Sequence, residues 1–321
     1  MRAAGRTGTG PFFGELAHLA TKTWAENTDL SPSLPARERL PTGLRAEPWL
    51  DYSNCVDFNK LRCPSGPAGP SVPSPPSLFS LVIPAYNEAL RLPPYLATIR
   101  PYLEARYPGR HEVIVVDDGS RDGLADVLQK AAVDWPALRW IRHESNRGKG
   151  AAVATGMLAA RGDLVLFADA DGATPIAEEA HLAAAIAAGA DLAIGSRLLS
   201  GSGARRSRNW FRGLAGRLFA ALARRMLRLS VRDTQCGFKM FRGEVSRRLF
   251  AVVREPGYLF DLELLALAVK FGYRTAEVPI NWAEVPGSHL SLARALPKVV
   301  RDLWRVRRRL RRDTHEEVET C

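Results

Sequence analysis

Short apolar runs alternate with longer amphipathic segments from residue 78 onward. Runs rich in β-branched and aliphatic side chains predict strands at 78–84, 112–118, 138–143, 163–169 and 191–196. Segments with a helical period separate them and lie near 90–105, 123–132, 149–160 and 176–188. Strands whose apolar runs are nearly continuous and that alternate with helices predict a mostly parallel sheet with helices on both faces. This is the doubly wound type of α/β fold.

Residues 1–77 differ in composition from the rest of the chain. The stretch 64–77 reads PSGPAGPSVPSPPS, and such a density of proline cannot form a helix or a central strand. We interpret it as a linker that follows a disordered extension, with short docked helices as the alternative for 12–62. The folded domain is then predicted to cover 78–291, and a basic amphipathic tail to cover 292–321.

Composition limits the class of protein. The chain has 321 residues, of which 46% are hydrophobic and 25% charged, enough for one large domain or two small ones. A formal net charge of +11 favours an anionic partner such as nucleic acid, a membrane surface or a phosphorylated small molecule. The four cysteines are too few and too scattered for a disulfide framework or a paired zinc motif, so a reducing compartment is expected.

No apolar run approaches the ~18 residues that a membrane-spanning helix needs. The N-terminus has no continuous apolar core, so the sequence does not predict a secretory signal. Its first acidic residue is Glu15, which leaves an organelle transit peptide open as an alternative.

Ligands of doubly wound sheets bind beyond the carboxyl ends of the strands, so the residues at these positions are the candidates for chemistry. The segment after the first strand reads PAYNE, where a dinucleotide site would have G-x-G-x-x-G. Lys149 lies in NRGKG but lacks the upstream glycine of a phosphate-binding P-loop. These differences argue against a dinucleotide-dependent oxidoreductase and a P-loop nucleotidase.

Acidic side chains follow the second and the fourth predicted strands. Asp117 and Asp118 lie in DDGSRDG, and Asp169 and Asp171 lie in FADADGAT. Two carboxylates spaced D-x-D after a buried strand raise each other's pKa unless a cation compensates them. Mg²⁺ or Mn²⁺, bridged to a diphosphate, would do so, whereas capping of the next helix is the alternative for each pair. With Lys149 nearby in sequence, the two pairs favour a metal-dependent nucleotide-diphosphate site.

Successive motifs resemble those of family 2 inverting glycosyltransferases, which have the GT-A fold. They are SLVIPAYNE (80–88), VVDDGSRDG (115–123), NRGKG (146–150), FADADGAT (167–174) and GSR (195–197). Downstream motifs are similar to those of dolichyl-phosphate β-glucosyltransferases and bacterial polyprenyl-phosphate glycosyltransferases, and the resemblance covers about 78–305. They are RDTQCGFKMF (232–241), FDLELL (260–265) and VPINWAEVPGSHLS (278–291).

The resemblance implies transfer of glucose from UDP-glucose to a dolichyl or polyprenyl phosphate. GDP-mannose as donor and a soluble small molecule as acceptor are the alternatives within the same chemistry. A protein that binds a nucleotide sugar without transferring it, and that docks on a membrane or a nucleic acid, is the alternative from another class.

The resemblance also implies roles for single residues. Nucleotide-sugar binding is implied for Pro84, Tyr86, Glu88, Asp117, Asp118, Lys149, Asp169 and Ala170. Asp169 and Asp171 are the implied ligands of Mg²⁺ or Mn²⁺, which acts as a Lewis acid on the leaving diphosphate. Asp171 and Asp233 are the implied catalytic residues.

For three residues, namely Arg197, Asp233 and Lys239, an alternative stands beside the implied role. Arg197 and Lys239 are implied contacts of the donor or acceptor phosphate, and ordinary surface cations are the alternative. For Asp233 the alternative is an ion pair with Arg232 or another cation. Cys236 is expected to be a small packed residue, because inverting transfer needs no covalent intermediate.

Two basic segments have an amphipathic pattern. In 209–232 large apolar residues recur every four positions among arginines, and 292–312 repeats the pattern and ends in an arginine cluster. Both are predicted to be helices that lie in the interface of an anionic membrane. A helix docked on the domain's own sheet and nucleic-acid binding by the tail are the alternatives. We therefore expect a peripheral membrane protein on the cytosolic face.

Overall fold

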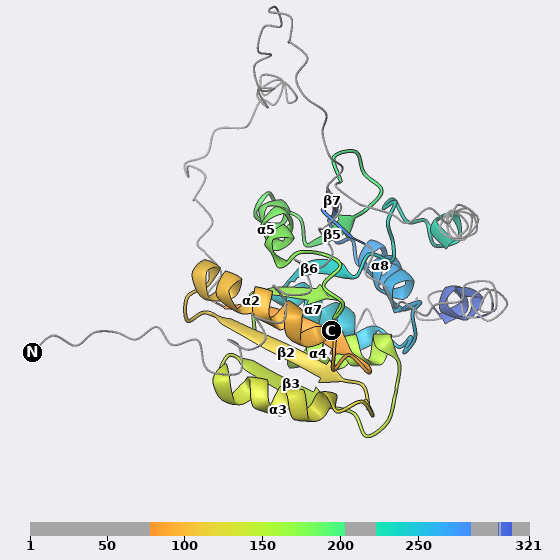
Figure 1. Ribbon diagram of the computed structural model, residues 1–321. Coiled ribbons are helices and arrows are strands. Elements are labelled where there is room, and N and C mark those ends of the chain that lie inside the picture. The colour runs from red at the N-terminus through yellow and green to blue at the C-terminus, as the bar shows by residue number, and fades with distance from the viewer. Residues whose placement is uncertain (1–77, 203–222, 284–300, 302, 310–321) are drawn as a thin grey trace, which may run out of the picture. The chain divides into compact units, whose positions relative to one another are not determined.

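The structure is a computed structural model that describes residues 78–202, 223–283, 301 and 303–309 (Figure 1). The predicted extension and linker at 1–77 lie outside the described residues. The same holds for most of the amphipathic segment 209–232 and of the tail 292–321.

A seven-stranded sheet forms the centre, in the order β3-β2-β1-β4-β6-β5-β7. The strands are β1 (Phe79–Ala85), β2 (His111–Asp117), β3 (Leu138–Arg142), β4 (Leu164–Ala168), β5 (Leu192–Ser196), β6 (Phe238–Arg242) and β7 (Thr275–Pro279). β6 runs antiparallel to β4 and β5, whereas the other pairs are parallel. The mostly parallel α/β sheet predicted from the sequence is confirmed. The first five strands lie where the apolar runs place them.

Four helices lie at the expected positions. They are α2 (Leu92–Arg106), α3 (Leu124–Asp134), α4 (Lys149–Ala159) and α5 (Glu179–Ala187), which follows the short 3-10 helix η3 (Ile176–Glu178). Two further helices, α7 (Gly243–Val252) and α8 (Phe260–Lys270), follow β6 and lie outside the segments predicted from the helical pattern. α4 packs closely on β1 and β2, where a side chain at Gly156 would collide with Val82 and Val116. Every residue of β1 is buried, as expected for a central strand that is covered on both faces.

This topology brings distant segments to one edge of the sheet. The parallel strands β1, β2 and β4 end there, at Ala85, Asp117 and Ala168. Because β6 is antiparallel, it begins at the same edge, and its Phe238 pairs with Ala168. The segment before β6 therefore reaches the acidic segments that follow the parallel strands.

The described end of the segment 209–232 differs from the prediction of one helix through 232. The chain is helical only through residue 227, because Arg228 has a φ of 55°, in the left-handed region that ends a helix. Leu227, Leu229 and Val231 are buried in the core. This portion therefore packs on the domain, as in the docked-helix alternative. Of the described helices, none is long and apolar enough to cross a bilayer.

A buried carboxylate ties the first three strands together. Glu112 on β2 accepts hydrogen bonds from Ser80 Oγ on β1 (2.6 Å), the backbone N–H of Arg161 (2.8 Å) and Arg139 Nε on β3 (3.2 Å). Ser80 Oγ in turn accepts the N–H of Gly162. Burial alone would raise the pKa of Glu112, but these donors and the two arginines lower it below the ordinary value of 4.5.

We predict that Glu112→Gln destabilises the fold by about 2 kcal/mol at neutral pH, because an amide leaves one buried donor unsatisfied. A carboxylate with a lowered pKa stabilises the fold above 4.5 and loses that contribution as the pH falls through its folded-state pKa. The difference between variant and wild type should therefore shrink in acid. Urea unfolding at several pH values measures it.

Glu104→Gln is the matched control, because Glu104 forms an exposed pair with Arg100 on α2. It should change the free energy of unfolding by less than about 1 kcal/mol. Equal effects of the two substitutions would contradict a structural role for Glu112.

Candidate active site

The segments after β1 and β2 are tied together by reciprocal hydrogen bonds. The backbone N–H of Asn87 donates to Ser120 Oγ (2.9 Å), and the N–H of Arg121 donates to Asn87 Oδ1 (3.0 Å). Asn87 has a φ of 56°, a left-handed conformation that asparagine tolerates well. The sequence analysis gave Asn87 no role. Its place between Tyr86 and Glu88 makes it the residue that shapes this wall of the site.

Asp117 offers an unsatisfied oxygen at this edge. The residue is buried, and its Oδ1 accepts the N–H of Ser120 at 2.8 Å. Among the described residues Oδ2 has no hydrogen-bond partner, although Arg142 Nε lies 3.5 Å away. A buried carboxylate oxygen without a hydrogen-bond donor is costly, so it is suited to accept an N–H from a ligand.

Asp118 has a different position from its neighbour. Its carboxylate accepts the backbone N–H groups of Arg147 (2.9 Å) and Gly148 (2.8 Å), and His143 Nδ1 lies 2.7 Å from it. These contacts hold the loop that leads into α4. Gly148 has a φ of 102°, and a Cβ there would lie 2.4 Å from the Pro256 carbonyl oxygen, so only glycine fits. Asp118 therefore positions the start of α4.

Lys149 opens α4 and carries the site's cation. Its Nζ lies 2.7 Å from Asp169 Oδ1 and 5.6 Å from the centroid of the Phe167 ring. Burial alone would lower the pKa of Lys149, but the carboxylates of Asp169 and Asp261 raise it above the ordinary value. Lys149 is therefore charged at neutral pH and held beside the D-x-D pair.

The D-x-D carboxylates lack a full complement of positive charge. Burial raises the pKa of Asp171, and the charge of Asp169 raises it further. Within the described part of the chain, Asp171 Oδ1 accepts a hydrogen bond from the N–H of Ala173 at 3.1 Å. Burial also raises the pKa of Glu88, and the negative charge of Asp171 adds to this increase. The ion pair of Glu88 with Arg91 lowers the pKa but does not cancel the increase. A bound cation would relieve this accumulation of negative charge.

The donor set fits a divalent ion that shares its ligands with a substrate. Within the described ranges no three His, Cys, Asp or Glu residues form a ready metal cluster. Mg²⁺ and Mn²⁺ need few protein carboxylates when waters and phosphate oxygens complete their shell. Asp169 and Asp171 are sufficient for such a site.

Gly237 is a site residue to which the sequence analysis gave no role. Its carbonyl accepts the N–H of Asp169 at 3.0 Å. A Cβ at Gly237 would lie only 1.9 Å from Asp169 Oδ2, so a side chain here would displace that carboxylate. Gly237 belongs to the motif RDTQCGFKMF, but no local pattern reveals a contact with a residue 68 positions away in the sequence.

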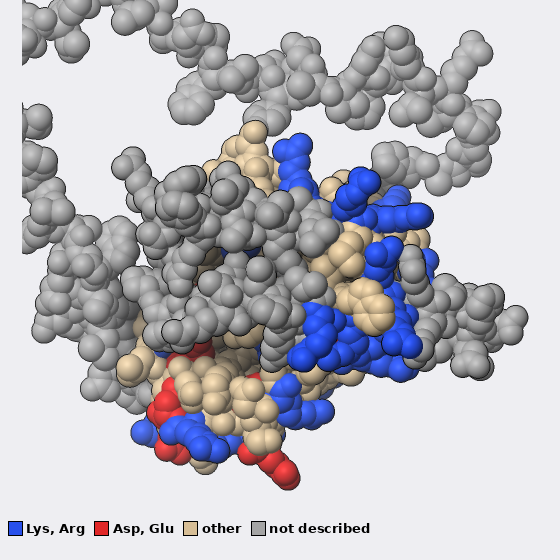
Figure 2. Space-filling model, turned by 90° about the vertical axis from the view of Figure 1, so that its right-hand side faces the viewer, with Lys and Arg blue, Asp and Glu red and all other residues tan. Residues whose placement is uncertain are grey.

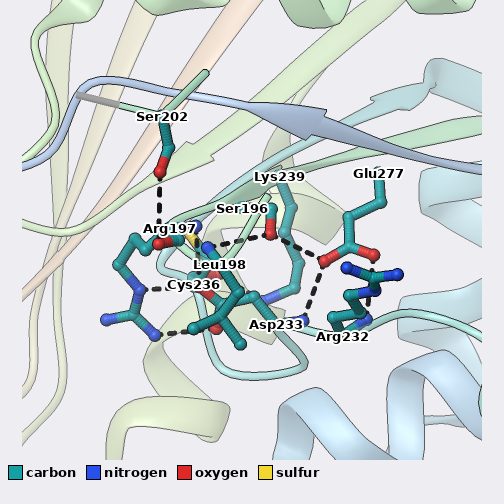
Figure 3. Close-up of polar contacts among 9 residues, drawn as sticks. All are labelled: Ser196, Arg197, Leu198, Ser202, Arg232, Asp233, Cys236, Lys239 and Glu277. Carbon is teal, nitrogen blue, oxygen red and sulfur yellow. Dashed lines mark hydrogen bonds and ion pairs between the residues drawn. The ribbon is translucent and has the colours of Figure 1, made fainter. Parts of the chain in front are cut away.

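Asp233 forms a bidentate pair with Arg197 (Figure 3). Arg197 Nε lies 2.7 Å from Asp233 Oδ2 and Nη2 lies 2.8 Å from Oδ1, and the backbone N–H of Arg197 donates to Oδ2 at 3.0 Å. Burial alone would raise the pKa of Asp233, but Arg197 lowers it below the ordinary value. With both oxygens occupied and a lowered pKa, Asp233 is poorly suited to accept a proton. Its partner is Arg197 and not Arg232.

Glu277 on β7 accepts hydrogen bonds from the segments that carry this pair (Figure 3). Its Oε1 accepts the N–H of Asp233 at 2.9 Å and the hydroxyl of Ser196 at 2.7 Å, and its Oε2 accepts the N–H of Arg232 at 2.8 Å. The sequence analysis did not assign β7 or Glu277. In the sequence, the acidic residue inside the short segment TAEVP is the only local sign that this segment has a role in the site.

Lys239 does not have the position expected of a residue that contacts a phosphate. It is fully buried on β6, and its ammonium group donates to Asp261 Oδ1 and to the carbonyl of Cys236, each at 2.5 Å. The arrangement therefore does not present Lys239 to a phosphate, because the charge of an inward-facing lysine must be neutralised within the fold. Cys236 is buried as expected, and burial raises the pKa of its thiol to about 12.

The structure thus brings Glu88, Lys149, Asp169 and Asp171 together, with Asp117 at the neighbouring strand end. The hydrogen bond and the charge of Asp233 are the main causes of the raised pKa of Arg197, and Arg197 lies near enough to this group for the charge of Asp169 to contribute. The other residues predicted to contact the nucleotide sugar differ in solvent exposure. Tyr86 is 45% exposed, whereas Pro84 and Ala170 are buried.

Comparisons with known proteins show the family to which the chain belongs. Residues 80–250 match the family described as glycosyl transferase family 2. A dolichyl-phosphate beta-glucosyltransferase of Drosophila melanogaster is 38% identical over 239 residues, which is 71% of this chain and 73% of the relative. The Saccharomyces cerevisiae protein of the same name is 36% identical over 245 residues, again 71% and 73% of the two chains.

Solved structures show the same fold at lower identity. Mannosyl-3-phosphoglycerate synthase from Rubrobacter xylanophilus matches with a TM-score of 0.55 and 23% identity, over 75% of this chain and 76% of that one. Glucosyl-3-phosphoglycerate synthase from Mycobacterium tuberculosis, in complex with Mn²⁺, UDP-glucose and phosphoglyceric acid, matches with a TM-score of 0.53 and 22% identity, over 72% and 80%. These likenesses confirm the predicted GT-A fold.

We predict that Cys236 in the native protein does not react with iodoacetamide at mildly alkaline pH. Its thiol is buried and its pKa is about 12, so almost no thiolate is present. Mass spectrometry of the labelled chain, native and in urea, measures this. Labelling of Cys236 in urea is the control, and rapid labelling in the native protein would contradict the described packing.

Proposed function

The chain belongs to glycosyl transferase family 2, and we propose that it transfers glucose from UDP-glucose to dolichyl phosphate or a related polyprenyl phosphate. The similarity to dolichyl-phosphate β-glucosyltransferases over 71% of the chain carries this proposal. The charged groups at the edge of the sheet support it, because they fit a nucleotide diphosphate and a metal ion.

Asp117 and Tyr86 are suited to hold the base of the donor. Asp117 Oδ2, which lacks a hydrogen-bond partner among the described residues, would accept the imide N–H of uracil. The exposed ring of Tyr86 would lie against the face of the base. A carboxylate can also accept an N–H from guanine, so the choice of UDP-glucose rests on the named relatives.

Asp169 and Asp171 would hold Mg²⁺ or Mn²⁺, which when bound supplies Lewis-acid stabilisation of the departing diphosphate. Lys149 starts a helix beside them, so both its ammonium group and the helix N-terminus favour a phosphate there. Asp118 contributes indirectly, because it holds the loop that places Lys149.

The acceptor needs positioning more than it needs a strong base. A phosphate monoester is mostly ionised at pH 7, since its second pKa is about 6. One of its oxygens would attack the anomeric carbon from the face opposite UDP, and that new C–O bond forms as the bond to the diphosphate breaks. Arg197 is the cation suited to orient this phosphate, and Asp233 holds Arg197 in place. Asp233 is thus proposed as a positioning residue.

The acceptor is a lipid, so the proposed reaction takes place at a membrane surface. The test is transfer of labelled hexose from UDP-glucose, with GDP-mannose in parallel, to a short polyprenyl phosphate in detergent with Mn²⁺. We expect lipid-linked glucose that is lost on chelation and restored by Mn²⁺. Lipid-linked mannose, or hydrolysis of UDP-glucose without a lipid product, would overturn the proposal.

Asp171→Asn should lower kcat/KM for transfer at least about 100-fold, as expected for loss of a group that stabilises developing charge. Thermal unfolding should remain cooperative, because Asp171 makes few contacts within the fold. Asp126→Asn is the matched control, since Asp126 is exposed on α3 and should retain full turnover. Retained transfer by Asp171→Asn would remove Asp171 from the metal site.

Gly237→Ala should abolish most transfer, because its Cβ would occupy the place of the Asp169 carboxylate. Initial rates and the Mn²⁺ concentration at half-maximal rate measure the effect. Gly109→Ala is the control: Gly109 has a φ of 67° but open space around it, so that variant should lose about 1 kcal/mol of stability and keep its turnover. Equal turnover in both variants would contradict the proposed contact.

A further inference from the structure

A helix near the C-terminus, described at 301 and 303–309, contacts the catalytic domain along one side (Figure 1, dark blue). Leu303 and Val306 are completely buried. Arg309 Nη1 lies 2.9 Å from Oε1 of Glu263, which is itself buried on α8. One face of this helix is therefore covered by the domain.

The opposite side of the helix carries a tryptophan among arginines. Arg301, Trp304, Arg305 and Arg308 have the spacing i, i+3, i+4 and i+7, which places them on one face, and all four are exposed. Trp304 is 57% exposed, and the Arg308 guanidinium lies 5.5 Å from the centroid of its ring. We call these four residues the arginine–tryptophan face.

Figure 2 views the molecule from the side on which this helix lies in Figure 1. Lys and Arg side chains gather over one part of that side, whereas the visible Asp and Glu side chains lie in another part. A positive region of this kind attracts an anionic surface. An exposed indole beside it is typical of helices that lie at the level of lipid headgroups.

We propose that the arginine–tryptophan face docks the enzyme on an anionic lipid bilayer. This inference rests on the proposed function, because the acceptor is then a lipid phosphate at a bilayer surface. Each arginine near an anionic membrane contributes about 1 kcal/mol, and the indole adds interfacial burial. The apolar face of the helix is already covered by the domain, so the charged face is the one that remains to meet the lipid.

The docked helix is joined to the active site through Glu263. While Oε1 of Glu263 binds Arg309, its Oε2 accepts the backbone N–H groups of Arg254 (3.0 Å) and Glu255 (2.6 Å). The next residue of that loop, Pro256, accepts the N–H of Ala151 at 3.2 Å in the first turn of α4. The arginine–tryptophan face is therefore connected to the element that carries Lys149. Docking through this face would hold the site at a constant place relative to the bilayer.

The experiment is co-sedimentation of the full chain with vesicles of phosphatidylcholine, with and without phosphatidylserine, at low and high salt. We expect binding that requires phosphatidylserine and weakens with salt. The variant with Trp304→Ser and Arg308→Ser should bind about tenfold or more weakly, as expected for loss of one charge and one interfacial ring. Its transfer to a short polyprenyl phosphate in detergent should equal that of wild type.

The matched control is Lys130→Ser with Val133→Ser, which removes one cation and one exposed apolar side chain from α3. It should bind vesicles like wild type. The single variant Arg308→Gln covers the case in which the double variant does not fold, and it should show a smaller loss in the same direction.

Three results would overturn the docking inference: equal vesicle binding by the variant and wild type, an equal loss in the control, or salt-sensitive binding to duplex DNA without binding to vesicles. The detergent assay keeps the two proposals apart. Vesicle binding that depends on Trp304 and Arg308, without transfer in detergent, would leave the docking surface standing and overturn the proposed function.

Discussion

Carboxylates that lie at or near the interior of the fold, each requiring a donor or a cation, are the constraint on which this structure depends. Asp118 is satisfied by two backbone amides, Asp233 by Arg197 and Asp261 by Lys239. Such contacts offset the free-energy cost of burying charge. Asp117 Oδ2 has no hydrogen-bond donor in the described chain, although Arg142 Nε lies 3.5 Å away, and burial raises the pKa of Asp171. The acids that the fold leaves unsatisfied are the ones at which a base and a metal ion are proposed to bind.

The same principle separates residues that contact substrate from residues that position others. Lys149 and Arg197 are cations whose side chains remain partly exposed beside their acids, whereas Lys239 is a cation enclosed by the fold. Gly237 acts through size alone, because its lack of a side chain leaves room for Asp169. Under these proposals the positioning residues orient the groups that bind the two substrates, and the arginine–tryptophan face holds the enzyme at the bilayer. Together they would bring a lipid phosphate and a nucleotide sugar to one place.

Several features could be predicted because they are local. Five strands follow from continuous apolar runs, and the acids after β2 and β4 follow from the rule that ligands bind at strand ends. The missed strands β6 and β7 each contain a charged residue: Lys239 is the second residue of FKMFR, and Glu277 is the third of TAEVP. Both side chains bind partners far along the chain, so no local pattern marks these segments as strands. The helix predicted through 232 ends at residue 227, because the chain turns at the left-handed Arg228, and Leu229 and Val231 beyond the turn are buried in the core.

The sequence by itself determined the α/β class, the order of the motifs and the identity of the acids, because periodicity and strand-end position are properties of neighbouring residues. Only the tertiary structure decided what each charge does. Asp233 pairs with Arg197, 36 positions away, and Lys239 pairs with Asp261, 22 positions away. Which cation neutralises which acid depends on strand order, and above all on the antiparallel entry of β6 between β4 and β5. Strand order is set by packing across the whole sheet, and a pattern read along the chain does not contain it.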